Sequence, residues 1–327
     1  MGCVPHDRRN HELGPREIDA ACRRLDATTD TSVVGCDRLH VVGLQAPEDR
    51  RLSYASLDEA LSAGGVHITE VSAAGAVNEI LVQNHLNTPV FVMLGDEVTG
   101  SKQNRTFVSS FMVPPTSQQR LPVACIERGR WHSASPRFGS AGRSSHARLR
   151  RQLIQMVHTS CMTTGAVEVD QRAVWSEVGR KLHALRCQSP TGSLSQAYVD
   201  WHGELFRLAA ELRAPAECCG VAFVIDGKTT GIDIFDKAET LGKQWRKLVA
   251  AHLLDALELR GRTPGPLDPA GARTCVRSAL DGWGASSSAA YDSAGMGTSV
   301  RLERPTELAA ALVVGDVAVH IAICVGA

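Results

Sequence analysis

Residues 88–113 of the chain read TPVFVMLGDEVTGSKQNRTFVSSFMV, and two β-rich runs in this segment enclose a polar stretch. The polar stretch, residues 94–105, holds two acids, two bases, two amides and two glycines, residue types that are uncommon in a buried core. Short runs of this kind, separated by Gly, Asn and Pro, predict an antiparallel β region that is sandwich-like or barrel-like. Four further runs surround it: RLHVVGL (38–44), GVHITEVS (65–72), NEILVQNH (78–85) and RLPVACIE (120–127).

The second half of the chain combines helical periodicity with hairpin signals. Residues 174–185 and 194–212 each place apolar side chains at helical spacing on one face. An Asp-Gly pair at 226–227 and a Gly-Asp pair at 315–316 separate β-branched or apolar runs, which predicts two hairpins. We therefore expect an α+β fold, with an antiparallel β-rich first half followed by helices packed on antiparallel hairpins.

Composition suggests how the chain is organised. Residues 1–34 are charged and weakly periodic and predict an arm, followed by a β-rich half (35–132) and an α+β half (133–327). The Ser/Gly/Arg-rich residues 133–147 predict a loop, and residues 260–297 a long excursion or a weak helix. We expect the two halves to form one continuous domain.

Charge and cysteine usage exclude several classes of protein. Lys plus Arg equals Asp plus Glu, 35 each in 327 residues, which argues against a general nucleic-acid or membrane-surface protein. The ten cysteines are scattered, without the spacing of a zinc site, and fit free thiols in a reducing compartment. The first residues contain no apolar run, so we expect a cytoplasmic protein without a signal peptide or membrane span. The oligomeric state stays open.

The charge is nevertheless uneven in one part of the chain. Residues 98–151 hold ten bases, nine of them arginine, against the single acid Glu127, a net charge of +9. The planar guanidinium of arginine suits phosphate and carboxylate groups. A solvated face and a basic helix start can explain the last of these arginines. Lys102, Arg105 and Arg130 lie beside polar residues at the ends of predicted strands and are stronger candidates for binding an anion.

Two acids are candidate catalytic residues. Glu97 follows one predicted strand, and Glu127 ends another. Paired carboxylates in one cleft could flank a glycosidic bond, or could hold Mg²⁺ against a diphosphate. Spacing does not separate these uses, so the cofactor stays open. A polar β-turn is the alternative explanation for Asp96 and Glu97.

Polar and aromatic residues of the same motifs complete the candidate site. Trp131 could stack on an adenine ring or belong to the core. No metal ligands are predicted, since the histidines and cysteines show no ligand spacing. The candidate ligand-binding residues are Lys102, Gln103, Asn104, Arg105, Arg130 and Trp131.

Several motifs together resemble a known family. In chain order they are GDEVTGSKQNR (95–105), LPVACIERGRW (121–131), SPTGSLSQAY (189–198), IDGKTTGIDIFD (225–236), GMGTSVRLE (295–303) and AALVVGDVAVHIAI (310–323). They are similar to the pattern of the bacterial ARG and rhodanese-phosphatase-superfamily-associated protein domain, from about residue 38 to the end. The family's name records an association with ADP-ribosylglycohydrolases and phosphatase-like proteins. The resemblance therefore implies a place in NAD or ADP-ribose metabolism.

These observations lead to competing functional hypotheses. The leading one is binding and hydrolysis of an ADP-ribose- or NAD-related anion, with arginines on the diphosphate and Glu97 with Glu127 at the ribosyl or phosphoryl centre. The alternative is a non-catalytic sensor or partner module for the same kind of anion. Nucleic-acid binding through residues 137–151 is disfavoured by the neutral total charge and the lack of interleaved aromatic residues.

Overall fold

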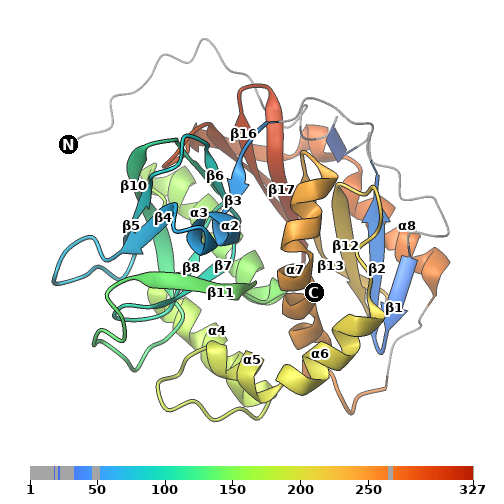
Figure 1. Cartoon of the computed structure of the whole chain (residues 1–327). Coiled ribbons are helices and arrows are strands. Elements are labelled where there is room, and N and C mark those ends of the chain that lie inside the picture. The colour runs from blue at the N-terminus through green and yellow to red at the C-terminus, as the bar shows by residue number, and fades with distance from the viewer. Residues whose placement is uncertain (1–17, 19–20, 23–32, 46–51, 264–267, 327) are drawn as a thin grey trace.

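The computed structural model describes residues 18, 21–22, 33–45, 52–263 and 268–326 (Figure 1). Most of the predicted arm, residues 1–34, lies outside the described residues. The described chain forms a large sheet, a smaller barrel with a short three-stranded sheet beside it, and helices between and around them, so the predicted α+β class is confirmed.

The larger β structure is an antiparallel sheet of eight strands. Turn chemistry forms its hairpins: Asp226 and Gly227 both have positive φ, 49° and 74°, as a two-residue type I′ turn requires, and Gly315 has φ 63°. Both predicted hairpins are confirmed. In spatial order the strands are β1 (Val33–Cys36), β2 (Leu39–Leu44), β12 (Gly220–Ile225), β13 (Lys228–Phe235), β17 (Val317–Val325), β16 (Glu307–Val314), β15 (Thr298–Glu303) and β14 (Ser287–Asp292).

The smaller β structure is a closed barrel, the barrel-like form of the predicted β region rather than a sandwich. Its strands in order are β10 (Ser117–Cys125), β5 (Glu79–Asn84), β4 (Val66–Thr69), β11 (Phe138–Ser144), β7 (Asp96–Gly100) and β8 (Arg105–Phe107). Beside it lies a three-stranded sheet of β3 (Ala55–Ser56), β6 (Val90–Val92) and β9 (Phe111–Val113).

Strand β11 corrects one prediction. Its sequence, FGSAGRS, lies in the segment that we expected to be a loop. The strand pairs with β4 on one side and β7 on the other, so closure of the barrel satisfies its backbone although its side chains have little β propensity. The β-rich region therefore extends past residue 132.

Helices cover both faces of the large sheet. Helices α3 and α7 pack against one face, where alternate residues such as Val41 and Phe223 belong to the core shared with the barrel. Helix α8 packs against the other face, with Val42 and Val224 (Figure 1). The helices are α2 (Leu57–Ser62), α3 (Ala147–Thr164), α4 (Gln171–Ala184), α5 (Ser195–Asp200), α6 (His202–Glu211), α7 (Ala238–Glu258) and α8 (Pro269–Leu280), with a 3₁₀ turn at Trp283–Ala285.

The remaining expectations for this half are mostly met. The apolar stripe of residues 174–185 is buried along α4, as predicted. Residues 260–297, expected to be a long excursion or a weak helix, contain the twelve-residue helix α8 and also the edge strand β14. None of the helices that the structure describes combines the length and hydropathy of a membrane-crossing segment.

Candidate functional site

Three of the quoted motifs meet at one end of the barrel. Strands β7 and β8 are joined by a tight turn in which Gly100 and Ser101 have positive φ, 111° and 40°. Strand β10 ends next to this turn, since its last residue, Cys125, pairs with Arg105. A backbone bridge between Glu127 and Ser193 then adds the segment that leads into α5. The turn, the end of β10 and the start of α5 thus form one polar cluster.

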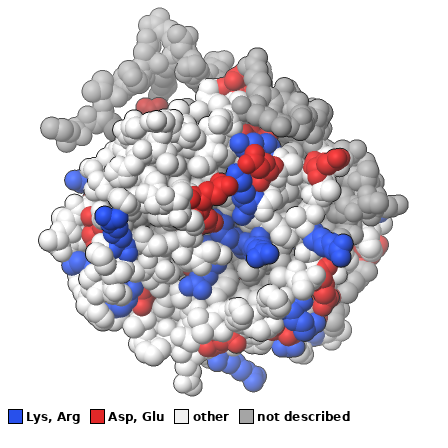
Figure 2. All heavy atoms as spheres, viewed as in Figure 1, with Lys and Arg blue, Asp and Glu red and all other residues white. Residues whose placement is uncertain are grey.

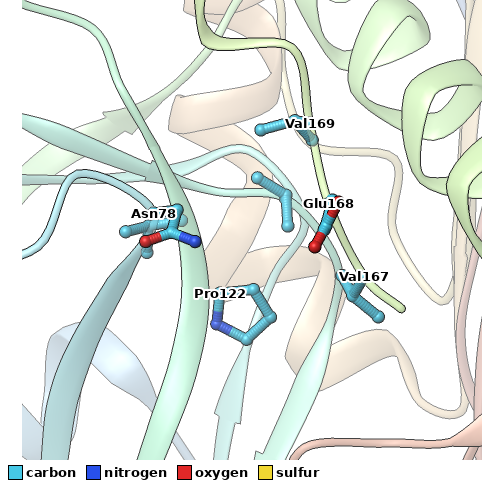
Figure 3. A pocket seen from close by; sticks show the side chains of 7 residues that line it. Asn78, Pro122, Val167, Glu168 and Val169 are labelled. Atoms are coloured by element: carbon cyan, nitrogen blue, oxygen red, sulfur yellow. The ribbon is translucent and has the colours of Figure 1, made fainter. Parts of the chain in front are cut away.

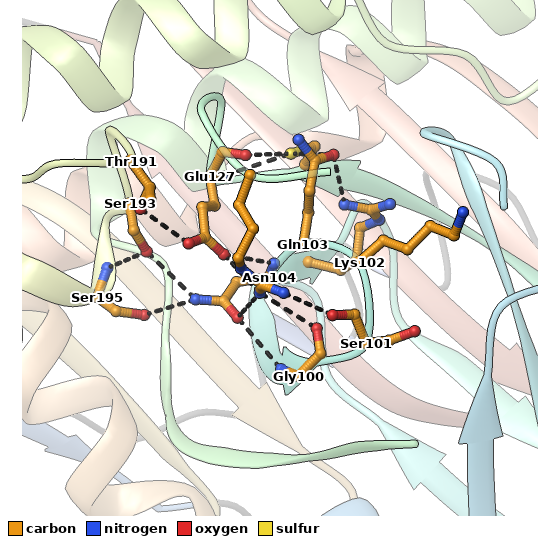
Figure 4. A network of polar contacts seen from close by, with 12 residues as sticks. Gly100, Ser101, Lys102, Gln103, Asn104, Glu127, Thr191, Ser193 and Ser195 are labelled. Carbon is orange, nitrogen blue, oxygen red and sulfur yellow. Dashed lines mark hydrogen bonds and ion pairs between the residues drawn. The ribbon is translucent and has the colours of Figure 1, made fainter. Parts of the chain in front are cut away.

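The Glu127 carboxylate is the centre of this cluster (Figure 4). Arg130 Nη2 donates to Glu127 Oε2 at 2.7 Å, and the Asn104 N–H donates to the same oxygen at 3.1 Å. Thr191 Oγ1 donates to Oε1 at 2.8 Å. Burial disfavours the charged carboxylate, but the hydrogen bonds from Arg130, Thr191 and Asn104 outweigh burial and lower its pKa. Glu127 is therefore held ionised, with both oxygens engaged.

Arg130 ties the two motif loops together. Beyond Glu127, its guanidinium donates to the backbone carbonyls of Gly100 at 3.3 Å, Ser101 at 2.5 Å and His132 at 3.1 Å. Arg130 is buried, so these contacts lie away from water. The guanidinium fixes the shape of the site and has little capacity left for a ligand.

Asn104 extends the cluster to the helical side. Its Nδ2 donates to the hydroxyls of Ser193 and Ser195, each at 3.2 Å, and its Oδ1 accepts from Arg130 at 3.2 Å. Thr191, Ser193 and Ser195 are partners that sequence reasoning missed, because SPTGS before a helix is explained by capping alone.

Arg105 points into the barrel. It is opposite Cys125 on β10 and Val98 on β7, and side chains at paired positions share a face of the sheet. Its Nη1 donates to Gln103 Oε1 at 3.0 Å and its Nη2 to the Ala76 carbonyl at 3.2 Å, whereas Nε has no partner among the described residues. The residue is fully buried, yet its ion pair with Glu70 is long, 4.0 Å. Burial lowers the pKa of this guanidinium.

Trp131 covers this end of the barrel. The Arg105 guanidinium carbon lies 5.8 Å from the centre of the indole ring, and the Lys102 ammonium lies 5.3 Å from it. Trp131 is nevertheless 47% exposed, so it is not a core residue. Lys102 Nζ also donates to the Ala74 carbonyl at 3.0 Å. Two cations therefore share one exposed aromatic ring.

Glu97 lies on the opposite face of the same strands. It pairs with Thr106, one residue from Arg105, so it points out of the barrel toward the helices. Ser145 Oγ donates to Glu97 Oε1 at 3.1 Å, and Arg143 Nε donates to Oε2 at 3.3 Å. Burial raises the pKa of Glu97, although Arg143 opposes this effect. Glu97 and Glu127 thus have separate ion-pair partners.

Arg143 connects the two carboxylates indirectly. Its Nη2 donates to Ser195 Oγ at 2.8 Å, and Ser195 in turn accepts from Asn104, which contacts Glu127. Arg143 was one of the ten bases in the basic stretch, but nothing in the sequence distinguished it from a solvated arginine. Its place on β11, predicted as loop, decides its role.

Asp96 belongs to a third charge cluster. Its carboxylate pairs at 2.7 Å with Lys247 of α7, which also contacts Asp58 of α2 at 2.8 Å. One turn earlier on α7, Lys243 pairs with Glu59 at 2.9 Å. Figure 2 shows acidic and basic side chains side by side in the middle of the face that carries α2 and α7. Asp96 is therefore separate from the barrel-end cluster.

The cavity in Figure 3 lies elsewhere. It has a volume of about 290 Å³ and opens between β10 and the segment before α4. Its lining is Asn78, Val108, Pro122, Val123, Val167, Glu168 and Val169, none of which is a predicted site residue. Within the described part of the chain, no group of three or more His, Cys, Asp or Glu side chains could hold a metal ion.

Comparison with known proteins agrees with the motifs. The family described as ARG and Rhodanese-Phosphatase-superfamily-associated Protein domain, ARPP-1, matches residues 31–324. The chain belongs to this family. The ARPP-1 match includes the barrel, the large sheet and the helices between them. No curated protein and no solved structure matches the chain.

Proposed function

We propose that this ARPP-1 protein binds an ADP-ribose- or NAD-related, phosphate-bearing small molecule at the end of the barrel. The observation that supports this proposal best is that Lys102 and Arg105 both face the exposed ring of Trp131. The family's association with ADP-ribosylglycohydrolases favours this class of ligand.

Charge is the first argument for the proposal. A buried guanidinium without a close counter-ion is costly, and Glu70 lies at 4.0 Å while Nε of Arg105 has no partner. A phosphate oxygen at the barrel end would neutralise this charge. Lys102, which is only half-buried, is the cation that a diphosphate meets first.

The ring of Trp131 is the second argument. Aromatic side chains bind nucleotide bases by stacking, which contributes about 1–3 kcal/mol per base. Trp131 is exposed beside the two cations. A ligand with an adenine joined to a diphosphate matches this combination, whereas a bare anion would use only the cations.

The carboxylates favour binding over the paired-acid mechanism. Both oxygens of Glu127 are hydrogen-bonded, and its pKa is lowered, which suits a structural anion better than a proton donor. Glu97 lies on the other face of β7, so the two acids do not flank a common bond. The non-catalytic alternative is thus our first choice.

Calorimetric titration with ADP-ribose, NAD and ADP tests the proposal. We expect saturable binding that weakens about tenfold or more in Trp131→Ala and Lys102→Gln, because stacking and a charged hydrogen bond each contribute about 1–3 kcal/mol. Arg105→Gln should abolish binding, although its burial requires a check of folding.

Two exposed positions provide matched controls. Phe206→Ala removes another exposed aromatic ring, 73% exposed on α6, and Arg120→Gln removes an exposed cation from the outer side of β10. Both variants should bind like the wild type. Equal binding by Trp131→Ala and Phe206→Ala would contradict a site at the barrel end.

Hydrolysis is the second candidate function. The environment of Glu97 is the observation that favours it. Burial raises the pKa of Glu97, as a general acid needs, and its partner Arg143 is partly open to solvent. Incubation with NAD, ADP-ribose and ADP-ribosylated substrates, with and without Mg²⁺, tests this function. Turnover should be lost in Glu97→Gln and kept in Asp170→Asn; no turnover under any condition removes the hydrolase hypothesis for these substrates.

A further inference from the structure

A second arginine without a carboxylate partner lies in the large sheet. Arg301 on β15 is fully buried, at 0% exposure. Its Nε donates to Tyr291 Oη at 3.0 Å and its Nη2 to Ser109 Oγ at 2.8 Å, while Nη1 has no hydrogen-bond partner in the part of the chain that the structure describes. Among the described residues it forms no ion pair. Its partners are two neutral hydroxyl groups.

The neighbouring carboxylate is already used. Asp233 receives both terminal nitrogens of Arg150 and, at 3.0 Å, Nε2 of His320. Ser110 Oγ lies 2.7 Å from His320 Nδ1, and burial lowers the pKa of this histidine, so it is neutral. The Asp233 carboxylate is thus occupied by Arg150 and His320, and Arg301 is left with its two hydroxyl partners.

We propose that Arg301, Ser109 and Tyr291 form a binding site for a small tetrahedral oxyanion, with phosphate as the simplest case. The free N–H of Nη1 and the two hydroxyls are three donors around one guanidinium, which is the chemistry that phosphate oxygens require. This site does not depend on the ligand at the barrel end.

The position of the site explains how an ion reaches it. Arg301 lies at the contact between the large sheet and the segment Val108–Ser110, which links β8 to β9. Tyr291 is half-buried on β14, and β14 is the edge strand of the sheet. An anion that binds here has to pass Tyr291, which is the partner of Arg301 that lies nearer to solvent.

The serine hydroxyl is available to the anion. Ser109 Oγ donates to the Ser110 carbonyl at 3.4 Å, which is long for a hydroxyl donor, so this proton can turn to a phosphate oxygen. Ser110 differs, because its hydroxyl is engaged by His320 and by the Leu94 N–H. Ser109 and not Ser110 therefore belongs to the site.

Calorimetric titration of the full chain with inorganic phosphate, at constant ionic strength in chloride, tests this proposal. We expect saturable binding with a single site in the wild type, no binding in Arg301→Met, and about tenfold weaker binding in Ser109→Ala. If Arg301→Met does not fold, Ser109→Ala and Tyr291→Phe decide, since both keep the arginine. Arg304→Met, in the turn between β15 and β16, removes an arginine that is paired with Glu307; it is the control and should bind normally.

Several results would overturn the site. Phosphate and sulfate stabilise most proteins without binding, so a rise in melting temperature that never saturates, and is the same in Arg301→Met, counts against it. Wild-type affinity in Ser109→Ala and Tyr291→Phe counts against it too. Loss of both phosphate and ADP-ribose binding in a folded Arg301→Met would also count against an independent site. Unchanged ADP-ribose binding in this variant is the result expected if the site is separate from the barrel end.

Discussion

Single buried side chains in this protein depend on partners that lie far away in the chain. His252 illustrates this: its ring stacks on Phe223 with centroids 3.8 Å apart, and its Nδ1 contacts Thr230 Oγ1 at 3.1 Å. Its Nε2 has no partner, and burial lowers its pKa to about 4. His252 is thus a buried histidine with only one of its two ring nitrogens hydrogen-bonded among the described residues.

This pKa makes stability depend on pH. The unfolded imidazole takes up a proton near pH 6.5, while the folded one does so only near about 4, so lowering the pH through this window favours the unfolded state. Urea unfolding at about pH 7 and about pH 4.5 should show a loss in the wild type that exceeds the loss in His252→Asn by about 2 kcal/mol. His183→Asn, on the exposed side of α4, should lose as much as the wild type; an equal loss in all three proteins contradicts the assignment.

At the same scale, the motifs that hold Glu127 and Arg130 meet at the barrel end, but the sequence did not indicate that Glu97 faces away from them. Glu127 and Arg130 stand three positions apart and pair with each other. Glu97 pairs with Arg143, 46 positions away, and Glu127 accepts a hydrogen bond from Thr191, 64 positions away. Partners at that separation are set by the fold, so they leave no local pattern.

At the scale of turns and strands, some glycines are required because a side chain would clash with neighbouring atoms. Others are required only because their backbone φ is positive. Gly297, between β14 and β15, has φ 88°, and an added Cβ would lie 2.1 Å from the Val313 carbonyl oxygen. Gly315, in the next hairpin, has φ 63°, and no atom lies within 4 Å of its added Cβ. The two positions thus separate backbone strain from steric exclusion.

Alanine substitution should distinguish these two glycines. Gly315→Ala should lower the free energy of unfolding by about 1 kcal/mol, because alanine is strained at positive φ and no other cost is added. Gly297→Ala must also displace a backbone carbonyl, so we expect a loss at least about twofold larger. Denaturant unfolding of both variants measures the difference. Equal losses would show that the β14–β15 turn shifts to accommodate the added methyl group at little cost.

Element prediction succeeded where the signal was local. The Asp-Gly pair at 226–227 predicted the hairpin, and the helical spacing of apolar residues predicted α4. Strand β11 failed because its partners, β4 and β7, supply the hydrogen bonds that its own composition does not favour. Before α5, which begins at Ser195, Ser193 contacts Asn104, a partner that no local pattern indicates.

At the scale of the whole molecule, buried charges join the barrel to the helices. Lys247 of α7 is almost fully buried, and it contacts Asp96 of β7 and Asp58 of α2. Burial opposes its charge, but the two carboxylates more than offset this and raise its pKa. Lys243, one turn away, is partly exposed and pairs with exposed acids.

Removing each lysine should therefore have very different effects. Lys247→Met leaves Asp96 buried without its counter-ion, which should cost about 3–5 kcal/mol of unfolding free energy. Lys243→Met removes a partly exposed pair and should cost about 1 kcal/mol or less. Thermal and denaturant unfolding check both values. A small loss in Lys247→Met would mean that Asp96 is neutral in the folded protein.

The sequence by itself determined the α+β class, the two hairpins, the helical stripes and the concentration of charged motif residues, because periodicity and turn chemistry act between neighbours. Only the tertiary structure decided that the β region closes into a barrel and that Glu97 and Arg105 point to opposite faces of it. It also decided which guanidinium groups lack a close counter-ion, because burial and distant partners fix the energy of a charge.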